Sequence, residues 1–79
     1  MTQIPERGTV KMFDHDRRFG FIRPDNPGAQ DVFIHARVLS RCGVDSLEKG
    51  DRVEFEAVAD ERGRHAEWVQ LTNLPTPVR

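Results

Sequence analysis

Two pairs of aromatic side chains stand where they could bind a planar ligand. Phe19 and Phe21 are two residues apart in "RRFGFIRP", and Phe33 and His35 have the same spacing in "DVFIHA". Residues spaced by two point to the same face of a β-strand. Flat rings beside arginines offer surfaces on which unpaired bases stack and positive charge for phosphates. The chemistry indicated is binding, and single-stranded RNA and DNA are the expected partners.

Positive charge is concentrated near these rings, although the whole chain is nearly neutral. Lys11, Arg17, Arg18 and Arg23 lie on or beside the aromatic segments. The chain has 12 basic and 13 acidic residues, a balance that argues weakly against nucleic-acid binding. Residues 1–41 hold seven Lys or Arg and five Asp or Glu. Residues 42–79 hold five Lys or Arg and eight Asp or Glu. We therefore expect a polyanion to meet the first half, although an imbalance this small also arises by chance.

No pattern of catalytic or metal-binding residues is present in the sequence. His15, His35 and His65 with Cys42 lack the spacing of zinc ligands. Cys42 has no identifiable base partner, and no Gly-rich phosphate loop or catalytic dyad is found. We expect no catalytic residues, no metal, no cofactor and no small-molecule substrate. The protein is predicted not to be an enzyme.

Length and composition indicate one small domain. The 79 residues are too few for two hydrophobic cores, and the single cysteine excludes an internal disulfide. No apolar run approaches the roughly 20 residues of a membrane helix, and the N-terminal segment lacks the apolar core of a signal peptide. We expect a cytoplasmic protein without a membrane partner.

Turn residues recur about every ten positions and no long helical period is found, which favours strands. The segments "PDNPGAQ" and "DERGR" are predicted turns. Val38, Leu39 and Leu47 are expected to pack on the core around a short helical turn. The predicted fold class is all-β, a small five-stranded closed antiparallel barrel, because closure removes exposed strand edges. The predicted strands are residues 8–14, 18–23, 31–36, 51–59 and 65–72.

Alternation along the strands separates aliphatic from aromatic side chains. Phe33 and His35 oppose their aliphatic neighbours in "DVFIHA", and Phe19 and Phe21 oppose Ile22. The apolar residues predicted to line the barrel, all aliphatic except Phe55, are Val10, Ile22, Val32, Ile34, Ala36, Val53, Phe55, Ala57 and Val69. Phe19, Phe21, Phe33 and His35 are then outside, and we call them the aromatic surface. Contiguous exposed apolar area usually indicates binding. The reverse assignment would bury the rings and expose the aliphatic residues.

The chain resembles the bacterial cold-shock domain. The resemblance runs from about residue 7 to residue 72 through "GTVKMFDHDRRFGFIRPDNPGAQDVFIHARVL", "LEKGDRVEFEA" and "ERGRHAEWV". "FGFI" and "DVFIH" occur at the family's spacing and in its order. The resemblance implies an oligonucleotide-binding barrel in residues 7–72, which binds single-stranded RNA and DNA, between an N-terminal tail of residues 1–6 and a C-terminal tail of residues 73–79.

The resemblance also assigns roles to residues. The aromatic surface matches the family's stacking residues. Lys11 and Asp31 match polar positions at the same surface, and Phe13 matches an aromatic residue at its margin. Met12 replaces the usual Trp, and Arg18 replaces a usual Gly. The predicted nucleic-acid-binding residues are Lys11, Met12, Phe13, Arg18, Phe19, Phe21, Asp31, Phe33 and His35.

Several departures from the family pattern affect the expected affinity. Ala36 and Val44 stand where the family often has Phe, so with Met12 three stacking surfaces are missing or reduced. At about 1 kcal/mol each, binding would be some hundredfold weaker than with a full set. Apolar contact by Met12 and a cation–π contact by Arg18 would recover part of this loss.

Trp68 has three open interpretations: packing at a barrel seam, an added aromatic edge of the binding face, or a dimer contact. Ala66 and Trp68 are two residues apart and would face the same side of a regular strand, whereas Val69 would face the other side. This break in the apolar alternation predicts a β-bulge.

The predicted function is binding of single-stranded RNA and DNA with low sequence specificity. The resemblance implies a nucleic-acid chaperone or a regulator of transcription or translation, in the response to cold or other stress. The alternative is a protein-interaction or dimerisation module that uses the same rings and binds nucleic acid weakly. An oligosaccharide-binding barrel would share this architecture, but only the aromatic residues of the sequence favour that interpretation. A monomer is expected, and a dimer remains open.

Overall fold

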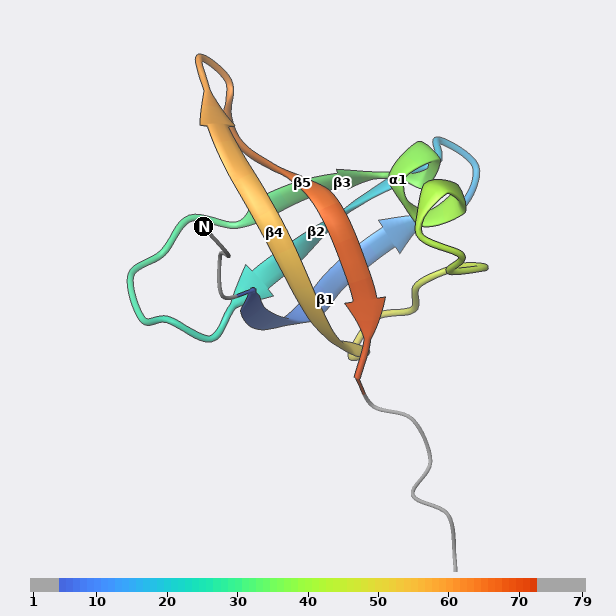
Figure 1. Ribbon diagram of the computed structural model, residues 1–79, viewed down its shortest axis with the longest axis horizontal. Helices are drawn as coiled ribbons and strands as arrows, with labels where there is room; N and C mark the ends of the chain where they lie inside the picture. Colours follow the sequence, from blue (N-terminus) through green and yellow to red (C-terminus); the bar gives the residue numbers. More distant parts are fainter. Residues whose placement is uncertain (1–4, 73–79) are drawn as a thin grey trace, which may run out of the picture.

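The computed structural model describes residues 5–72 as a closed barrel of five strands with one short helix (Figure 1). Residues 1–4 of the predicted N-terminal tail and the whole predicted C-terminal tail, residues 73–79, lie outside the described residues. Glu6 was also assigned to the N-terminal tail, but it is the first residue of β1. The strands follow one another around the barrel in the order β1-β2-β3-β5-β4, which confirms the predicted fold class. The elements are β1 (Glu6–Asp14), β2 (Phe19–Pro24), β3 (Val32–His35), α1 (Ala36–Arg41), β4 (Arg52–Asp60) and β5 (Gly63–Leu71).

The barrel was predicted to be antiparallel throughout, but one pair of neighbouring strands is parallel. β3 and β5 run parallel, with Val32 opposite Arg64 and Phe33 opposite His65. The other four pairs of neighbouring strands are antiparallel. Five strands in a ring cannot alternate in direction all the way round, so one pair must be parallel. β3 and β5 share only this short stretch of pairing.

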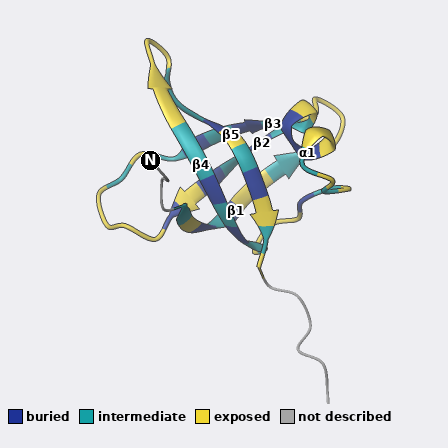
Figure 2. Cartoon of the chain, in the orientation of Figure 1, coloured by how far each residue is buried: buried dark blue, intermediate teal, exposed yellow. Residues whose placement is uncertain are grey.

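The core is aliphatic apart from Phe55, as the alternation predicts. Val10, Ile22, Val32, Ile34, Val53, Phe55 and Val69 are all at most 1% exposed. Val38 and Leu39 of α1, together with Leu47, join this cluster, which confirms that the segment after β3 packs back onto the barrel. Figure 2 shows the buried segments on the strands and an exposed tip at the β4–β5 hairpin. Ala57 is only partly buried and packs against the edge of the core.

β3 ends one residue earlier than the strand that the sequence predicts. Ala36 was expected to line the barrel as a strand residue, but it is partly buried and begins α1. His35 is the N-cap: its backbone is extended, and its Nδ1 accepts a hydrogen bond from the Arg37 N–H at 2.9 Å. A capping side chain satisfies one of the backbone donors that a helix start leaves unpaired. The chain therefore leaves the sheet at His35.

Two β-bulges change the phase of the strands. In β5, Trp68 pairs with Glu56 and Ala66 pairs with Ala57, which leaves Glu67 as the extra residue. This confirms the predicted bulge. In β1, Val10 pairs with Ile22 and Met12 with Phe21, so that Lys11 is extra. The sequence did not predict this second bulge.

No helix in the part of the chain that the structure describes is long and apolar enough to cross a membrane.

Candidate nucleic-acid interface

The aromatic surface is a block of four side chains on β2 and β3. Phe19 lies opposite His35, and Phe21 lies opposite Phe33. Opposite residues of an antiparallel pair project on the same face. The ring centroid of Phe19 is 6.1 Å from that of Phe21 and 5.6 Å from that of Phe33, and Phe21 and Phe33 are 5.8 Å apart.

All four side chains are partly buried, and none belongs to the buried core. The rings therefore face outward, as the alternation predicts, with one side packed on neighbours and one side accessible.

Met12 joins the aromatic surface because of the bulge at Lys11. Val10 points into the barrel, and without the extra residue Met12 would point inward as well. The bulge instead pairs Met12 with Phe21, on whose face it is 37% exposed. Regular alternation from Val10 would turn Met12 inward, and the register explains why Met12 instead lies on the surface to which the resemblance assigns it.

Lys11 and Asp31 lie together, as the resemblance implies. The Lys11 Nζ is 2.9 Å from Asp31 Oδ2, and the two side chains are 51% and 35% exposed. Exposed ion pairs contribute little to stability, about 0 to 1 kcal/mol. The ammonium group can therefore exchange this carboxylate for a phosphate at small cost.

Phe13 is separated from the three other phenylalanines of the candidate set. It pairs with Gly20 at the end of the barrel and packs against the core. A Cβ on Gly20 would lie 2.6 Å from the Phe13 ring, so glycine is required for this packing. The Phe13 ring contacts His15 instead, with 5.2 Å between centroids. Phe13 thus lies beside the aromatic surface and not within it.

A small cavity of about 130 Å³ is lined by three positions at which the chain departs from the family pattern, Arg18, Ala36 and Val44, and by Phe13, which matches it. Arg18 has a left-handed backbone with φ of 67°, and its carbonyl accepts a hydrogen bond from the Ala36 N–H at 2.8 Å. The structure therefore brings Arg18 to the start of α1.

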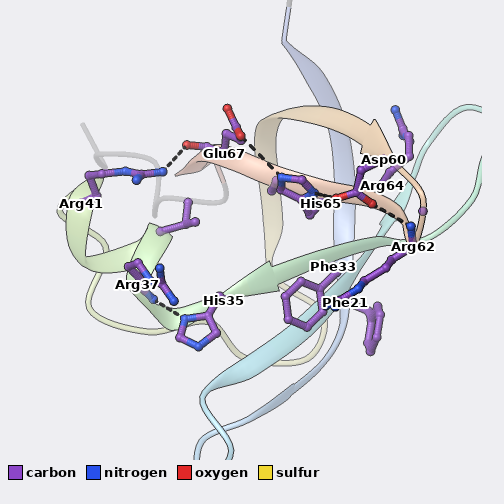
Figure 3. Close-up of a pocket in the computed structure, with 13 residues that line it drawn as sticks. Phe21, Phe33, His35, Arg37, Arg41, Asp60, Arg62, Arg64, His65 and Glu67 are labelled. Atoms are coloured by element: carbon purple, nitrogen blue, oxygen red, sulfur yellow. Dashed lines mark hydrogen bonds and ion pairs between the residues drawn. The ribbon is translucent and has the colours of Figure 1, made fainter.

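Several cationic residues near the rings were not among the predicted site residues. Arg37 and Arg41 of α1 and Arg62 of the β4–β5 hairpin line a groove of about 480 Å³ together with Phe21 and Phe33 (Figure 3). The signal in the sequence was the spacing of four between Arg37 and Arg41, which places both on one side of a helix.

Trp68 is partly buried on β5 opposite Glu56, and it is not among the residues that line the groove. Its neighbour Val69 points into the core, so Trp68 projects from the outer face of β5. The three interpretations of its role remain predictions.

Two ion pairs at the barrel's ends shift pKa values. The Arg64 guanidinium donates two hydrogen bonds to the Glu6 carboxylate at 2.8 and 3.0 Å, and these lower the pKa of Glu6. Arg52 likewise lowers the pKa of Asp25 through hydrogen bonds of 2.8 and 2.6 Å. Arg64 and Arg52 therefore already have anionic partners. Within residues 5–72, no group of three or more His, Cys, Asp or Glu could hold a metal ion.

Comparison with known proteins agrees with this geometry. Residues 6–72 match the family model described as the "Cold-shock" DNA-binding domain. Cold shock protein CspA of Rhizobium meliloti is 49% identical over 53 residues, which are 67% of this chain and 75% of the relative. The proteins of that name from Staphylococcus aureus and Staphylococcus haemolyticus are each 44% identical over 61 residues, covering 77% of this chain and 89% of the relative.

Proposed function

The chain belongs to the cold-shock DNA-binding domain family, and on that premise we propose that it binds single-stranded RNA and DNA with low sequence specificity and acts as a nucleic-acid chaperone. The family and the relatives indicate a nucleic-acid binder of the cold or stress response rather than an enzyme. The binding domain in this proposal is residues 7–72. Its contacts are the aromatic surface with Lys11, Met12, Phe13, Arg18 and Asp31. The cytoplasmic location stays a prediction from the sequence.

The observation that carries the proposal is that the rings are not needed for the core. Aliphatic side chains and Phe55 fill the barrel, and the largest of them are fully buried. Phe19, Phe21 and Phe33 nevertheless pack against one another at centroid distances of 5.6 to 6.1 Å on the outside. Mutual packing restrains their rotamers before a ligand arrives, which reduces the entropy lost on binding. Such a surface suits flat, unpaired bases.

The magnitudes favour a chaperone over a helicase-like activity. Stacking on an aromatic side chain contributes about 1 to 3 kcal/mol per base. A duplex step is worth about 1.4 kcal/mol on average. A few stacked bases therefore offset the loss of a few duplex steps, which is enough to shift a short hairpin toward its open form. Long duplexes remain closed.

We predict that Phe21→Ala and Phe33→Ala each weaken binding of a labelled pyrimidine-rich strand by at least about fivefold, or about 1 kcal/mol. Each loses one stacking surface, and circular dichroism should show an intact barrel because neither ring is in the core. The matched controls Phe21→Tyr and Phe33→Tyr keep a ring and should bind like the unchanged protein. Unchanged affinity in both alanine variants would refute the aromatic surface as the site.

The same titration against single-stranded, hairpin and duplex oligonucleotides separates the proposal from the protein-interaction module. We expect preference for the single strand and opening of a weak hairpin. A protein that ignores all three ligands, and sediments as a tight dimer only while the rings are intact, would establish the alternative instead.

A further inference from the structure

The groove between α1 and the β4–β5 hairpin has cations that no described acid neutralises. Figure 3 shows Phe21, Phe33 and His35 along one side, Glu67 and His65 along the other, and the α1 arginines at one end. We call it the α1 groove, defined by Phe21, Phe33, His35, Arg37, Arg41 and Arg62. Its volume is about 480 Å³.

The two arginines of α1 both line the groove, and neither is paired with a carboxylate among the described residues. Arg37 and Arg41 are spaced by four residues in a helix, both line the groove and both are exposed. Arg41 Nη2 donates to the Glu67 carbonyl at 3.2 Å, a contact that orients the guanidinium without neutralising it.

Two carboxylates, those of Asp60 and Glu67, also line the groove, and both face His65 rather than the arginines of α1. Asp60 Oδ2 is 3.3 Å from His65 Nδ1, and Glu67 Oε2 is 3.5 Å from His65 Nε2. The imidazole offsets their negative charge only when it is protonated. Arg64, the remaining arginine of the lining, is held by Glu6. The α1 end of the groove therefore carries two positive charges in a chain whose formal net charge is −1. Unneutralised like charges repel one another, so an anion bound between them is favoured.

The groove continues the aromatic surface. Phe21, Phe33 and His35 belong to both, since they line the groove as well as forming the block on β2 and β3. His35 also links the two directly, because its Nδ1 caps the helix that carries the arginines. A strand that stacks on the rings and continues past His35 therefore reaches α1.

We propose that the α1 groove binds phosphodiester groups of the nucleic-acid strand beyond the bases stacked on the aromatic surface, with Arg37 and Arg41 as the phosphate contacts. This proposal rests on the proposed function and extends the footprint from the sheet onto the helix. Guanidinium groups suit phosphate because their planar fork can donate two parallel hydrogen bonds. Arg62, which also lines the groove, extends its positive charge toward the β4–β5 hairpin.

The test uses the Arg37→Gln/Arg41→Gln double variant and two labelled single strands at about physiological salt, where the screening length is about 8 Å. One strand of about 4 nucleotides covers the aromatic surface, and one of about 10 also reaches the groove. We expect the variant to bind the long strand at least fivefold more weakly and the short strand almost unchanged. The slope of log affinity against log salt for the long strand should shrink by about 1.4, since each single-strand phosphate contributes about 0.7.

Three further variants test whether charge at these two positions is responsible. Arg37→Lys/Arg41→Lys retains both charges and should retain the salt slope. Arg37→Gln alone leaves the Arg41 contact with Glu67 in place and should lower the slope by about 0.7. Its matched control is Lys49→Gln, which removes one exposed charge outside the groove and should leave the slope unchanged.

The failures are distinguishable. If the unchanged protein binds neither strand, the proposed function itself is wrong. If it binds both and the glutamine variants keep the long-strand affinity and slope, the α1 groove is not a phosphate site although the function stands. Equal loss on short and long strands would also overturn the proposal, because the arginines would then act through the aromatic surface.

Discussion

Individual side chains set the character of the binding surface. Met12 lies beside Phe21 with 37% of its surface exposed, because the extra residue Lys11 turns it out of the barrel. A thioether contacts a base but offers no flat ring. Ala36 and Val44 line a cavity of about 130 Å³ and also lack rings. Positions 12, 36 and 44 therefore offer no ring on which a base could stack. The effect of this on affinity stays a prediction.

At this scale we predict that Met12→Trp strengthens binding of a pyrimidine-rich strand by about fivefold, or about 1 kcal/mol. The added ring extends the aromatic surface next to Phe21 without entering the core. Fluorescence titration with a labelled strand measures the gain, and Met12→Leu serves as the apolar control without a ring. A tryptophan variant that binds no better than the leucine variant contradicts the assignment of Met12 to this surface.

The turn between β1 and β2 holds Arg18 in a left-handed backbone conformation. Asp14 Oδ1 accepts hydrogen bonds from the N–H groups of Asp16 and Arg17 at 3.0 and 3.1 Å, and its carbonyl accepts from Arg18 at 2.7 Å. These bonds close the turn and place Arg18 at φ of 67°. A left-handed backbone costs a residue with a Cβ about 1 kcal/mol, which glycine avoids. The glycine usual at this position in the family has the same physical reason.

We predict that Arg18→Gly raises the free energy of unfolding by about 1 kcal/mol, because the left-handed strain is released. Urea denaturation measures this change. The same variant should bind single strands more weakly, since it removes an exposed cation near the rings. A variant that is less stable than the unchanged protein would show that Arg18 forms compensating contacts in the turn.

Across the whole molecule, closure of the barrel depends on long-range contacts. The Arg64–Glu6 ion pair joins β5 to the start of β1, and the Arg52–Asp25 pair joins β4 to the end of β2. The charge count by halves of the sequence indicates only part of the positive surface. Arg37 and Arg41 belong to the basic first half, whereas Arg62 comes from the acidic second half and lines the same groove.

At this scale we predict a loss of stability in acid that depends on Glu6. Its pKa in the folded protein is below the ordinary value of 4.5, because the Arg64 hydrogen bonds favour the carboxylate. The stabilisation is fully present above that ordinary value and is lost as the pH falls through the lower folded-state value. Urea unfolding at a series of pH values should therefore show a shallower acid dependence for Glu6→Gln, and similarly for Arg64→Gln. If both variants keep the full acid dependence, other carboxylates are responsible.

Most of the fold and the face of the rings could be predicted from the sequence. Alternation with a period of two is a local property, so Phe19, Phe21, Phe33 and His35 were separated correctly from Ile22, Val32 and Ile34. The bulge at Glu67 was predicted for the same reason, because Trp68 and Val69 break a local phase. Ala36 was assigned to the strand, since a cap by the preceding side chain is a contact that alternation does not show.

Alternation in the sequence predicted most of the residues that fill the barrel and the four rings that remain outside, because side-chain chemistry and position in a strand largely decide burial. Ala36 and Ala57 were expected inside and are only partly buried. Only the tertiary structure showed the parallel β3–β5 seam, the bulge at Lys11 that turns Met12 outward, and the meeting of α1 with the β4–β5 hairpin. These features depend on the register between distant strands and on closing a ring of five. The strand register and the closure of the barrel cannot be predicted from any single segment, because both arise only when distant segments pair.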